Sequence, residues 1–160
     1  MAPRVGQPAP PFEARSDDGR ALSLGTLRGQ WIALVFWPGA QGPACPEAQA
    51  FERACPEFGA LGAVLVAVSR DTEAHLAQLR DRCGLGYPLL PDSAQVVARA
   101  YGVGGFRLWP ERWLGLGRRE TGQTFLIDPQ GRLAAHWPRV TSAEHLADVL
   151  TEVRQRQTPA

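Results

Sequence analysis

Cys45 is the residue of this sequence best placed for chemistry. The preceding run from Trp31 to Trp37, WIALVFW, is short, apolar and rich in strand-forming residues, and Pro38-Gly39 closes it. We therefore predict a buried strand that ends shortly before Cys45. Pro46 follows the cysteine, and proline is favoured at the first position of a helix, so Cys45 should lie at or beside a helix N-cap.

A helix N-terminus favours the thiolate form of a cysteine. Its unpaired amides and positive dipole end stabilise a negative charge, which lowers the thiol pKa from its ordinary value of about 8.5. The thiolate is the nucleophilic form, so Cys45 is the predicted nucleophile. The other two cysteines, Cys55 and Cys83, fall on apolar stripes of predicted helices, a pattern that favours packing in the core.

Composition limits the class of protein. A chain of 160 residues that is 44% hydrophobic can bury one substantial core, so we predict a single domain over residues 1–160. The net charge of +1, with both signs interspersed, provides no basic stripe for nucleic acid. No segment resembles a signal peptide or approaches the roughly 20 apolar residues of a membrane helix, which predicts a cytoplasmic protein without a membrane partner.

Metal binding and cofactor binding are not indicated. The three cysteines contain no C-x-x-C pair, and His75, His136 and His145 have no matching ligand spacing. We expect these histidines at the surface or at sheet edges. The predicted protein therefore has no metal site and no cofactor.

The remaining elements follow from turn residues and apolar periodicity. Asp17-Asp18-Gly19 predicts the turn of a β-hairpin, Pro56 is expected to kink or end the helix that begins near Cys45, and 102–117 is a long irregular segment. The other predicted elements are a helical turn at Leu24 to Gly29, a buried strand at Ala63 to Ser69, a helix from Asp71-Thr72 to Gly84, a short strand at Tyr87 to Leu90, a helix from Asp92-Ser93 to about Tyr101, two antiparallel strands at Gln123 to Ile127 and Arg132 to Trp137, and a last helix from Thr141-Ser142 to about Val153.

This order predicts an α/β fold. An N-terminal β-hairpin followed by β-α-β-α-(β)-α-β-β-α implies a central mixed sheet with helices on both faces, the order of the thioredoxin fold. A nucleotide-binding α/β fold is the competitor. However, Gly102 to Gly105 follows a predicted helix and matches no phosphate-loop spacing, so we prefer the thioredoxin fold.

Several segments also carry a family resemblance. Phe36 to Cys45, FWPGAQGPAC, is similar to the aromatic-Pro-x-x-x-Thr-Pro-x-Cys signature of the peroxiredoxins, and the chain most closely resembles their bacterioferritin comigratory protein (PrxQ) group. The resemblance implies a thiol peroxidase with Cys45 as peroxidatic cysteine and with Pro38 and Pro43 shaping its pocket. Further matching segments are Val5 to Phe12, Asp18-Gly19, Leu27 to Gly29, Tyr101 to Val103, and Thr124 to Asp128 with Gly131.

The chain departs from this family at two hydrogen-bond donors. Gly42 stands where the family has a Thr or Ser hydroxyl, and Gly122 stands where it has an arginine. Loss of one such donor typically lowers a rate by about 100- to 1,000-fold, so we expect slower oxidation than with the full signature, measurable by stopped-flow mixing with peroxide. Arg118 or Arg119 could supply a replacement charge. The alternative function is a degenerate peroxiredoxin-like redox sensor or partner-binding protein, and a thiol-disulfide oxidoreductase is disfavoured because C-x-x-C is missing.

The resemblance leaves open two schemes by which oxidised Cys45 is converted back to a thiol. Some PrxQ proteins carry a resolving cysteine five residues later, where this chain has Ala50, and others carry it on the next helix, near Cys83. Cys55 would lie roughly 15 Å from Cys45 along an intact helix, beyond the limit of about 7 Å between Cα atoms for a disulfide. Cys83 is thus the predicted resolving cysteine, with a one-cysteine mechanism as the alternative. The implied partners are hydrogen peroxide or an organic hydroperoxide and thioredoxin or a small thiol, and the chain would act as a monomer or homodimer.

Overall fold

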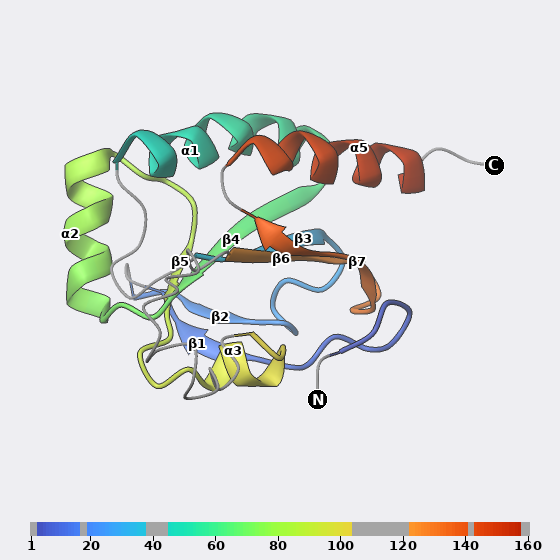
Figure 1. The fold of residues 1–160 in the computed structure, drawn as a ribbon, viewed down its shortest axis with the longest axis horizontal. Coiled ribbons are helices and arrows are strands. Elements are labelled where there is room, and N and C mark those ends of the chain that lie inside the picture. The colour runs from blue at the N-terminus through green and yellow to red at the C-terminus, as the bar shows by residue number, and fades with distance from the viewer. Residues whose placement is uncertain (1–2, 17–18, 38–44, 104–121, 141–142, 158–160) are drawn as a thin grey trace, which may run out of the picture.

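The computed structural model of the chain describes residues 3–16, 19–37, 45–103, 122–140 and 143–157. A five-stranded sheet in the order β5-β4-β3-β6-β7 forms the centre of the molecule (Figure 1). Its strands are β3 (Trp31–Phe36), β4 (Ala63–Ser69), β5 (Leu89–Pro91), β6 (Gly122–Ile127) and β7 (Leu133–Val140).

The sheet is mixed, as the order of elements predicts. β3 pairs in parallel with β4, which pairs in parallel with β5, whereas β6 runs antiparallel to both β3 and β7. Residues 32–36 of β3 are all buried, because β3 lies at the centre of the sheet with side chains packed on both of its faces. A strand covered in this way reads as a continuous apolar run rather than an alternating one.

Two helices cover one face of this sheet, and a third stands beside it. α1 (Cys45–Ala60) and α5 (Leu146–Gln157) lie side by side over one face, while α2 (Glu73–Cys83) stands beyond the β5 edge (Figure 1). Their apolar stripes join the inward side chains of the strands in one core. Its buried members include Val35, Leu65 and Leu126 from the sheet and Phe51, Phe58, Leu76, Leu79, Val149 and Val153 from the helices.

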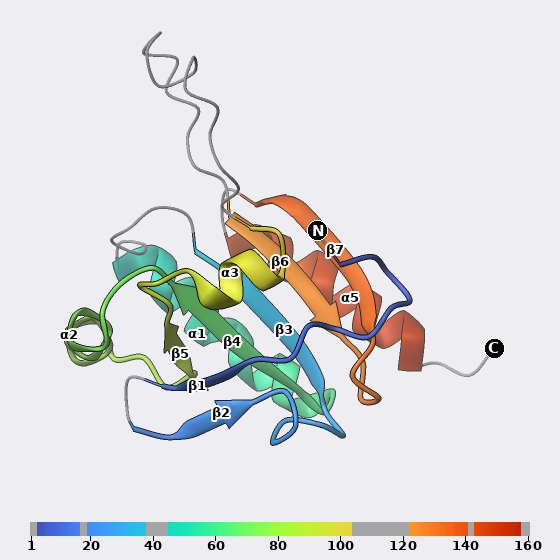
Figure 2. The same cartoon turned by 90° about the horizontal axis from the view of Figure 1, so that it is seen from below.

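The opposite face is covered by the hairpin of β1 (Glu13–Arg15) and β2 (Ala21–Ser23) and by the short helix α3 (Val96–Ala100) (Figures 1 and 2). Tyr101 is fully buried there, with its ring 5.7 Å from that of Phe36 and 5.0 Å from that of Phe125, between centroids. Its hydroxyl donates to the Pro10 carbonyl over 2.8 Å and so holds the N-terminal arm against this core. The expectation of helices on both faces is confirmed, although a single helical turn is all that α3 supplies.

Turn and cap residues define several boundaries as the sequence predicts. Thr72 caps α2, with its side-chain oxygen accepting from the amide of His75, and Gly84 ends the helix in the left-handed conformation at a φ of 67°. Asp128 accepts from the amides of Gln130 and Arg132 in the turn between β6 and β7. Glycine at such a C-terminal position costs little because it has no Cβ.

Other expected boundaries are met only in part. α1 runs through Pro56 to Ala60, so the exposed proline does not end the helix. Leu24 to Gly29 forms successive turns, in which Leu27 is buried. α5 reaches Gln157 after a 3-10 turn, η1 (Ala143–His145), while its expected cap Thr141-Ser142 lies outside the described residues.

The start of α3 also differs from the expected start at Asp92-Ser93. Gln95 precedes the helix in the left-handed region, at a φ of 56°, and this delays the first helical residue to Val96. The buried carboxylate of Asp92 nevertheless accepts from the amides of Val97 and Ala98, over 3.1 and 2.9 Å. Asp92 therefore satisfies the helix N-terminus from outside the expected cap position.

This arrangement predicts that Asp92 and Ser93 differ in their contributions to stability. Asp92→Ala leaves two buried amides without their acceptor, so the free energy of unfolding should fall by about 1–3 kcal/mol. Ser93 is exposed, and Ser93→Ala should change it by less than about 0.5 kcal/mol. Urea unfolding followed by circular dichroism measures both. An equal loss in the two variants would contradict this assignment of the cap.

Candidate active site

Cys45 is the first residue of α1 and is half-buried. β3 and Trp37 lead to it through residues 38–44, which include Pro38, Gly42 and Pro43 and lie outside the described residues. The prediction of a buried strand followed by a helix that opens at Cys45 and Pro46 is confirmed. The sulfur is therefore attached where the free amides of a helix N-terminus gather.

A disulfide joins Cys45 to Cys83, the last residue of α2. The two Cα atoms are 5.3 Å apart, although the residues are separated by 38 positions in the sequence. Cys83 is only 4% exposed and belongs to the core beneath the helices. The structure thus joins a half-buried cysteine to a buried one, and this pairing fits the scheme in which the second cysteine lies on the next helix.

Aromatic rings pack in the same core as the cysteine pair. Trp37, Phe51 and Tyr87 lie with their ring centroids 6.2–6.4 Å apart. The Tyr87 hydroxyl donates to the carbonyl of Ala48, three residues after Cys45, over 2.9 Å. Burial strongly raises the pKa of Tyr87, with a smaller effect from the charge of nearby groups. The phenol therefore stays protonated and keeps α1 attached to the segment that follows Cys83.

The third cysteine, Cys55, is in a different environment. It is half-buried on α1, where its thiol donates to the carbonyl of Phe51 over 3.4 Å. Burial, and secondly the negative charge of Glu52, raise the pKa of Cys55 to about 11. At neutral pH this cysteine is a thiol rather than a thiolate, in agreement with its predicted packing role.

Gly122 is the first residue of β6 and lies beside the end of β3, the strand that precedes residues 38–44 and Cys45. β6 runs antiparallel to β3, so Gln123 at its start pairs with Phe36 at the end of β3. Gly122 is buried and offers no side-chain donor. The two candidate replacements, Arg118 and Arg119, lie outside the described residues.

Of the three histidines expected at the surface or at sheet edges, His75 is exposed and His136 lies on the edge strand β7, whereas His145 is partly buried outside the sheet. The ring of His136 stacks on that of Phe125 with centroids 4.1 Å apart, and burial lowers its pKa. His145 Nε2 lies 2.7 Å from the hydroxyl of buried Thr124, and its ring packs near Phe51. His145 lies four residues before Val149, on the line of the buried face of α5. This spacing was a sequence signal that could have predicted its partly buried position.

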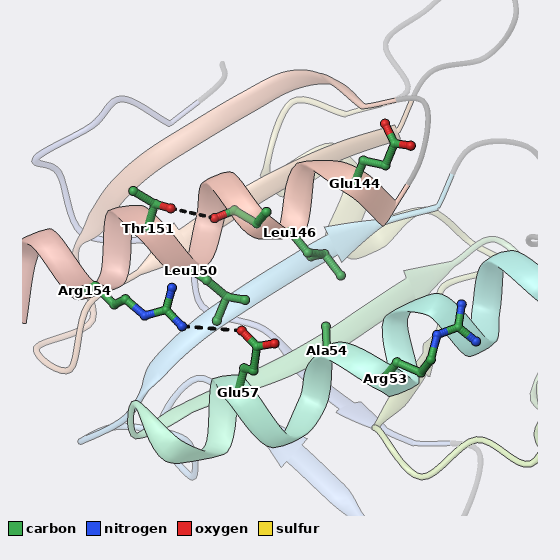
Figure 3. Close-up of a pocket in the computed structure, with 9 residues that line it drawn as sticks. Arg53, Ala54, Glu57, Glu144, Leu146, Leu150, Thr151 and Arg154 are labelled. Carbon is green, nitrogen blue, oxygen red and sulfur yellow. Dashed lines mark hydrogen bonds and ion pairs between the residues drawn. The ribbon is translucent and has the colours of Figure 1, made fainter.

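A groove of about 370 Å³ lies between α1 and α5 (Figure 3). Leu146 and Leu150 contribute apolar surface, while Arg154 and Glu57 form an ion pair of 3.4 Å across it. Neither Cys45 nor Cys83 lines the groove, so it is separate from the disulfide. Among the described residues, no cluster of three or more His, Cys, Asp or Glu is arranged for a metal, and no helix is long and apolar enough to cross a membrane.

A mixed sheet of this topology, with a cysteine pair linking the start of α1 to the end of α2, defines a thiol redox protein of the thioredoxin fold. The model of the AhpC/TSA family matches residues 5–136, and the chain belongs to that family. It is 31% identical to peroxiredoxin Bcp of Bacillus subtilis over 156 residues, covering 96% of this chain and 97% of the relative. It is 32% identical to a putative peroxiredoxin bcp of Coxiella burnetii over 152 residues, covering 94% and 98%.

The crystal structure of peroxidoxin BcpB from Mycobacterium tuberculosis has the same fold. It superimposes with a TM-score of 0.79 at 26% identity and covers 98% of this chain and 99% of that one. These similarities confirm the resemblance to the PrxQ-like group and exclude the competing nucleotide-binding fold. The chain is a thiol-dependent peroxidase of the peroxiredoxin type.

The environments of the cysteines predict a labelling order in the fully reduced protein. Iodoacetamide at pH 7 should modify Cys45 before Cys55, because a thiol with a pKa of about 11 is almost entirely protonated at that pH. Raising the pH toward 11 should accelerate labelling of Cys55, and unfolding in denaturant should remove the difference between the sites. Mass spectrometry measures the order. Faster labelling of Cys55 than of Cys45 in the folded protein would contradict it.

Proposed function

We propose that Cys45 is the peroxidatic cysteine and Cys83 the resolving cysteine of this peroxidase. The observation that carries the proposal is the disulfide between the first residue of α1 and the last residue of α2. Cys45 is the more accessible of the two, and Cys83 is 4% exposed. A peroxide therefore reaches Cys45 more readily, which favours this assignment over the reverse one.

The proposed cycle has three steps: oxidation of Cys45 by the peroxide, formation of the disulfide, and reduction of the disulfide. The Cys45 thiolate attacks one oxygen of the hydroperoxide, the O–O bond breaks, and the other oxygen takes a proton and leaves as an alcohol or as water. Cys45 becomes a sulfenic acid. The Cys83 sulfur then attacks the Cys45 sulfur, the S–O bond breaks, and the oxygen leaves as water with the proton of the Cys83 thiol as the disulfide forms. A dithiol, or two small thiols, returns both cysteines to thiols and is itself oxidised to a disulfide.

The missing side-chain donors shape the expected rate. Glycine at positions 42 and 122 provides no side-chain donor. Backbone amides at the start of α1 must therefore stabilise more of the negative charge that develops on the peroxide oxygens. Pro46 has no amide hydrogen, so the donors available there are the amide of Cys45 itself and those of later residues in the first turn. We propose that Pro38 and Pro43 shape the pocket and that turnover is slow compared with the full family signature.

The reductant and cellular setting complete the proposal. Thioredoxin or a small thiol is the proposed reductant, hydrogen peroxide or an organic hydroperoxide is the substrate, and the cytoplasm is the location. An intrachain disulfide needs no second subunit, so the chain would work as a monomer, or as a homodimer with independent sites. The absent donor at Gly122 supports one alternative, a sensor in which the same disulfide forms without efficient turnover.

Single cysteine substitutions test the assignment through turnover. In an assay coupled to thioredoxin and its reductase, Cys45→Ser should abolish peroxide consumption, while Cys55→Ser should match the wild type. Cys83→Ser should lower turnover by about tenfold or more and accumulate Cys45 as sulfinic acid, because the sulfenic acid has no resolving partner. Turnover of Cys83→Ser at the wild-type rate would support a one-cysteine mechanism instead. Disulfide formation without turnover in the wild type would support the sensor.

A further inference from the structure

One face of α1 contacts the segment that carries Cys83. Gln49 follows Cys45 by four residues and Glu52 follows Gln49 by three, so the three side chains share one face of the helix. Both polar side chains bond to backbone groups 34 residues away in the sequence. These groups lie at the end of α2 and in the loop after it.

Gln49 binds at Cys83 itself. Its side-chain nitrogen donates to the carbonyl oxygen of Cys83 over 3.0 Å. The last four carbonyls of a helix have no partner within the helix, and Cys83 is the final residue of α2. The amide of Gln49 thus satisfies a free carbonyl on the residue whose sulfur is bonded to Cys45.

Glu52 binds the backbone at Gly86, three residues after Cys83. Its carboxylate accepts from the amide of Gly86 over 2.9 Å. A Cβ at position 86 would lie 3.1 Å from the Glu52 carboxylate, which is tighter than nine in ten real Cβ contacts. Glycine at this position therefore allows the carboxylate to reach the backbone.

The loop between these two contacts is held by its own hydrogen bonds. The guanidinium of Arg80 donates to the carbonyls of Leu85 and Tyr87 over 2.8 and 2.7 Å. The amides of Gly84 and Leu85 in turn donate to the carbonyl of Arg80. Because this segment is braced internally, its attachments to α1 help to fix where Cys83 lies. They are the side chains of Gln49 and Glu52 and the Tyr87 hydroxyl, which donates to the Ala48 carbonyl.

We propose that Gln49 and Glu52 are positioning residues that hold the Cys83 segment against α1 so that its sulfur meets the sulfenic acid of Cys45. This inference rests on the proposed roles of the two cysteines. The clamp formed by Gln49 and Glu52 acts on the resolving step, in which the S–S bond forms and water leaves. Attack on peroxide needs only Cys45 and its surroundings, so the clamp leaves that step unchanged. Its consequence is kinetic, because the sulfenic acid is captured by Cys83 before a second peroxide oxidises it further.

Rapid-quench oxidation of reduced protein, followed by mass spectrometry, separates the two steps. Gln49→Ala should slow disulfide formation by about 2- to 10-fold, the effect of one neutral hydrogen bond. Glu52→Ala removes a charged acceptor and should slow it by about 10- to 100-fold. In both variants the rate of sulfenic acid formation should stay within about twofold of the wild type, and sulfinic acid should appear at lower peroxide concentration.

Three further variants distinguish positioning from general destabilisation. Glu52→Gln keeps an oxygen acceptor and should resolve faster than Glu52→Ala, while Gly86→Ala crowds the carboxylate and should slow resolution without changing any polar group. Gln78→Ala on α2 and Glu57→Ala on α1 are matched controls, because both side chains are exposed and neither contacts this segment. Both should resolve at the wild-type rate. Thermal unfolding confirms that each variant is folded.

The outcomes separate this inference from the proposed function. If the folded variants Glu52→Ala, Gln49→Ala and Gly86→Ala form the disulfide as fast as the wild type, the clamp is overturned while the cysteine roles stand. If the controls slow resolution as much as the clamp variants, the clamp is also overturned. If the wild type consumes peroxide without forming the Cys45–Cys83 disulfide, the proposed resolving role itself is wrong.

Discussion

The packing of α1 against α2 is the contact on which the chemistry of this molecule depends. Phe51 on α1 and Leu76 and Leu79 on α2 are buried in one core, and each such side chain stabilises the fold by about 1.5–3 kcal/mol. A disulfide that closes a loop of this length contributes about 4 kcal/mol by restricting the unfolded chain. That contribution disappears on reduction. The apolar contact and the Tyr87 hydrogen bond remain, so the two helices can keep their places when the cysteines are thiols.

The same fold gives three cysteines three different chemistries. Cys45 lies at a helix start, where free amides favour a negative charge. Cys55 lies in the middle of that helix, where burial and the charge of Glu52 hold it in the thiol form. Cys83 is buried at the end of the next helix, in the core that also contains Phe51. Reactivity is thus decided by position along α1 and α2 rather than by residue type.

Local patterns in the sequence were sufficient for most of the fold. The structure confirms the strands predicted from the apolar runs of β3 and β4. It also confirms the ends of α2 predicted from Thr72 and Gly84, because such caps depend only on neighbouring residues. The start of α3 was missed because it depends on the left-handed Gln95, a conformation that non-glycine residues seldom adopt.

The site was only partly predictable. Helix periodicity placed Cys83 on a packing stripe, and only the family resemblance suggested a bond to Cys45. The contacts of Gln49 and Glu52 join residues 34 positions apart, and no local pattern reports such a pairing. A surface or edge position is the usual expectation for a histidine, and it takes no account of the apolar stripe of α5. In the structure, the ring of His145 contacts Thr124 and packs near Phe51.

Counting free thiols after a single turnover tests the central claim most directly. The fully reduced chain has three thiols. One equivalent of peroxide should leave one thiol, which peptide mapping should identify as Cys55, in a chain that stays monomeric on a non-reducing gel. Two remaining thiols, or loss of Cys55, would show that Cys45 and Cys83 do not act as a pair and would contradict the account.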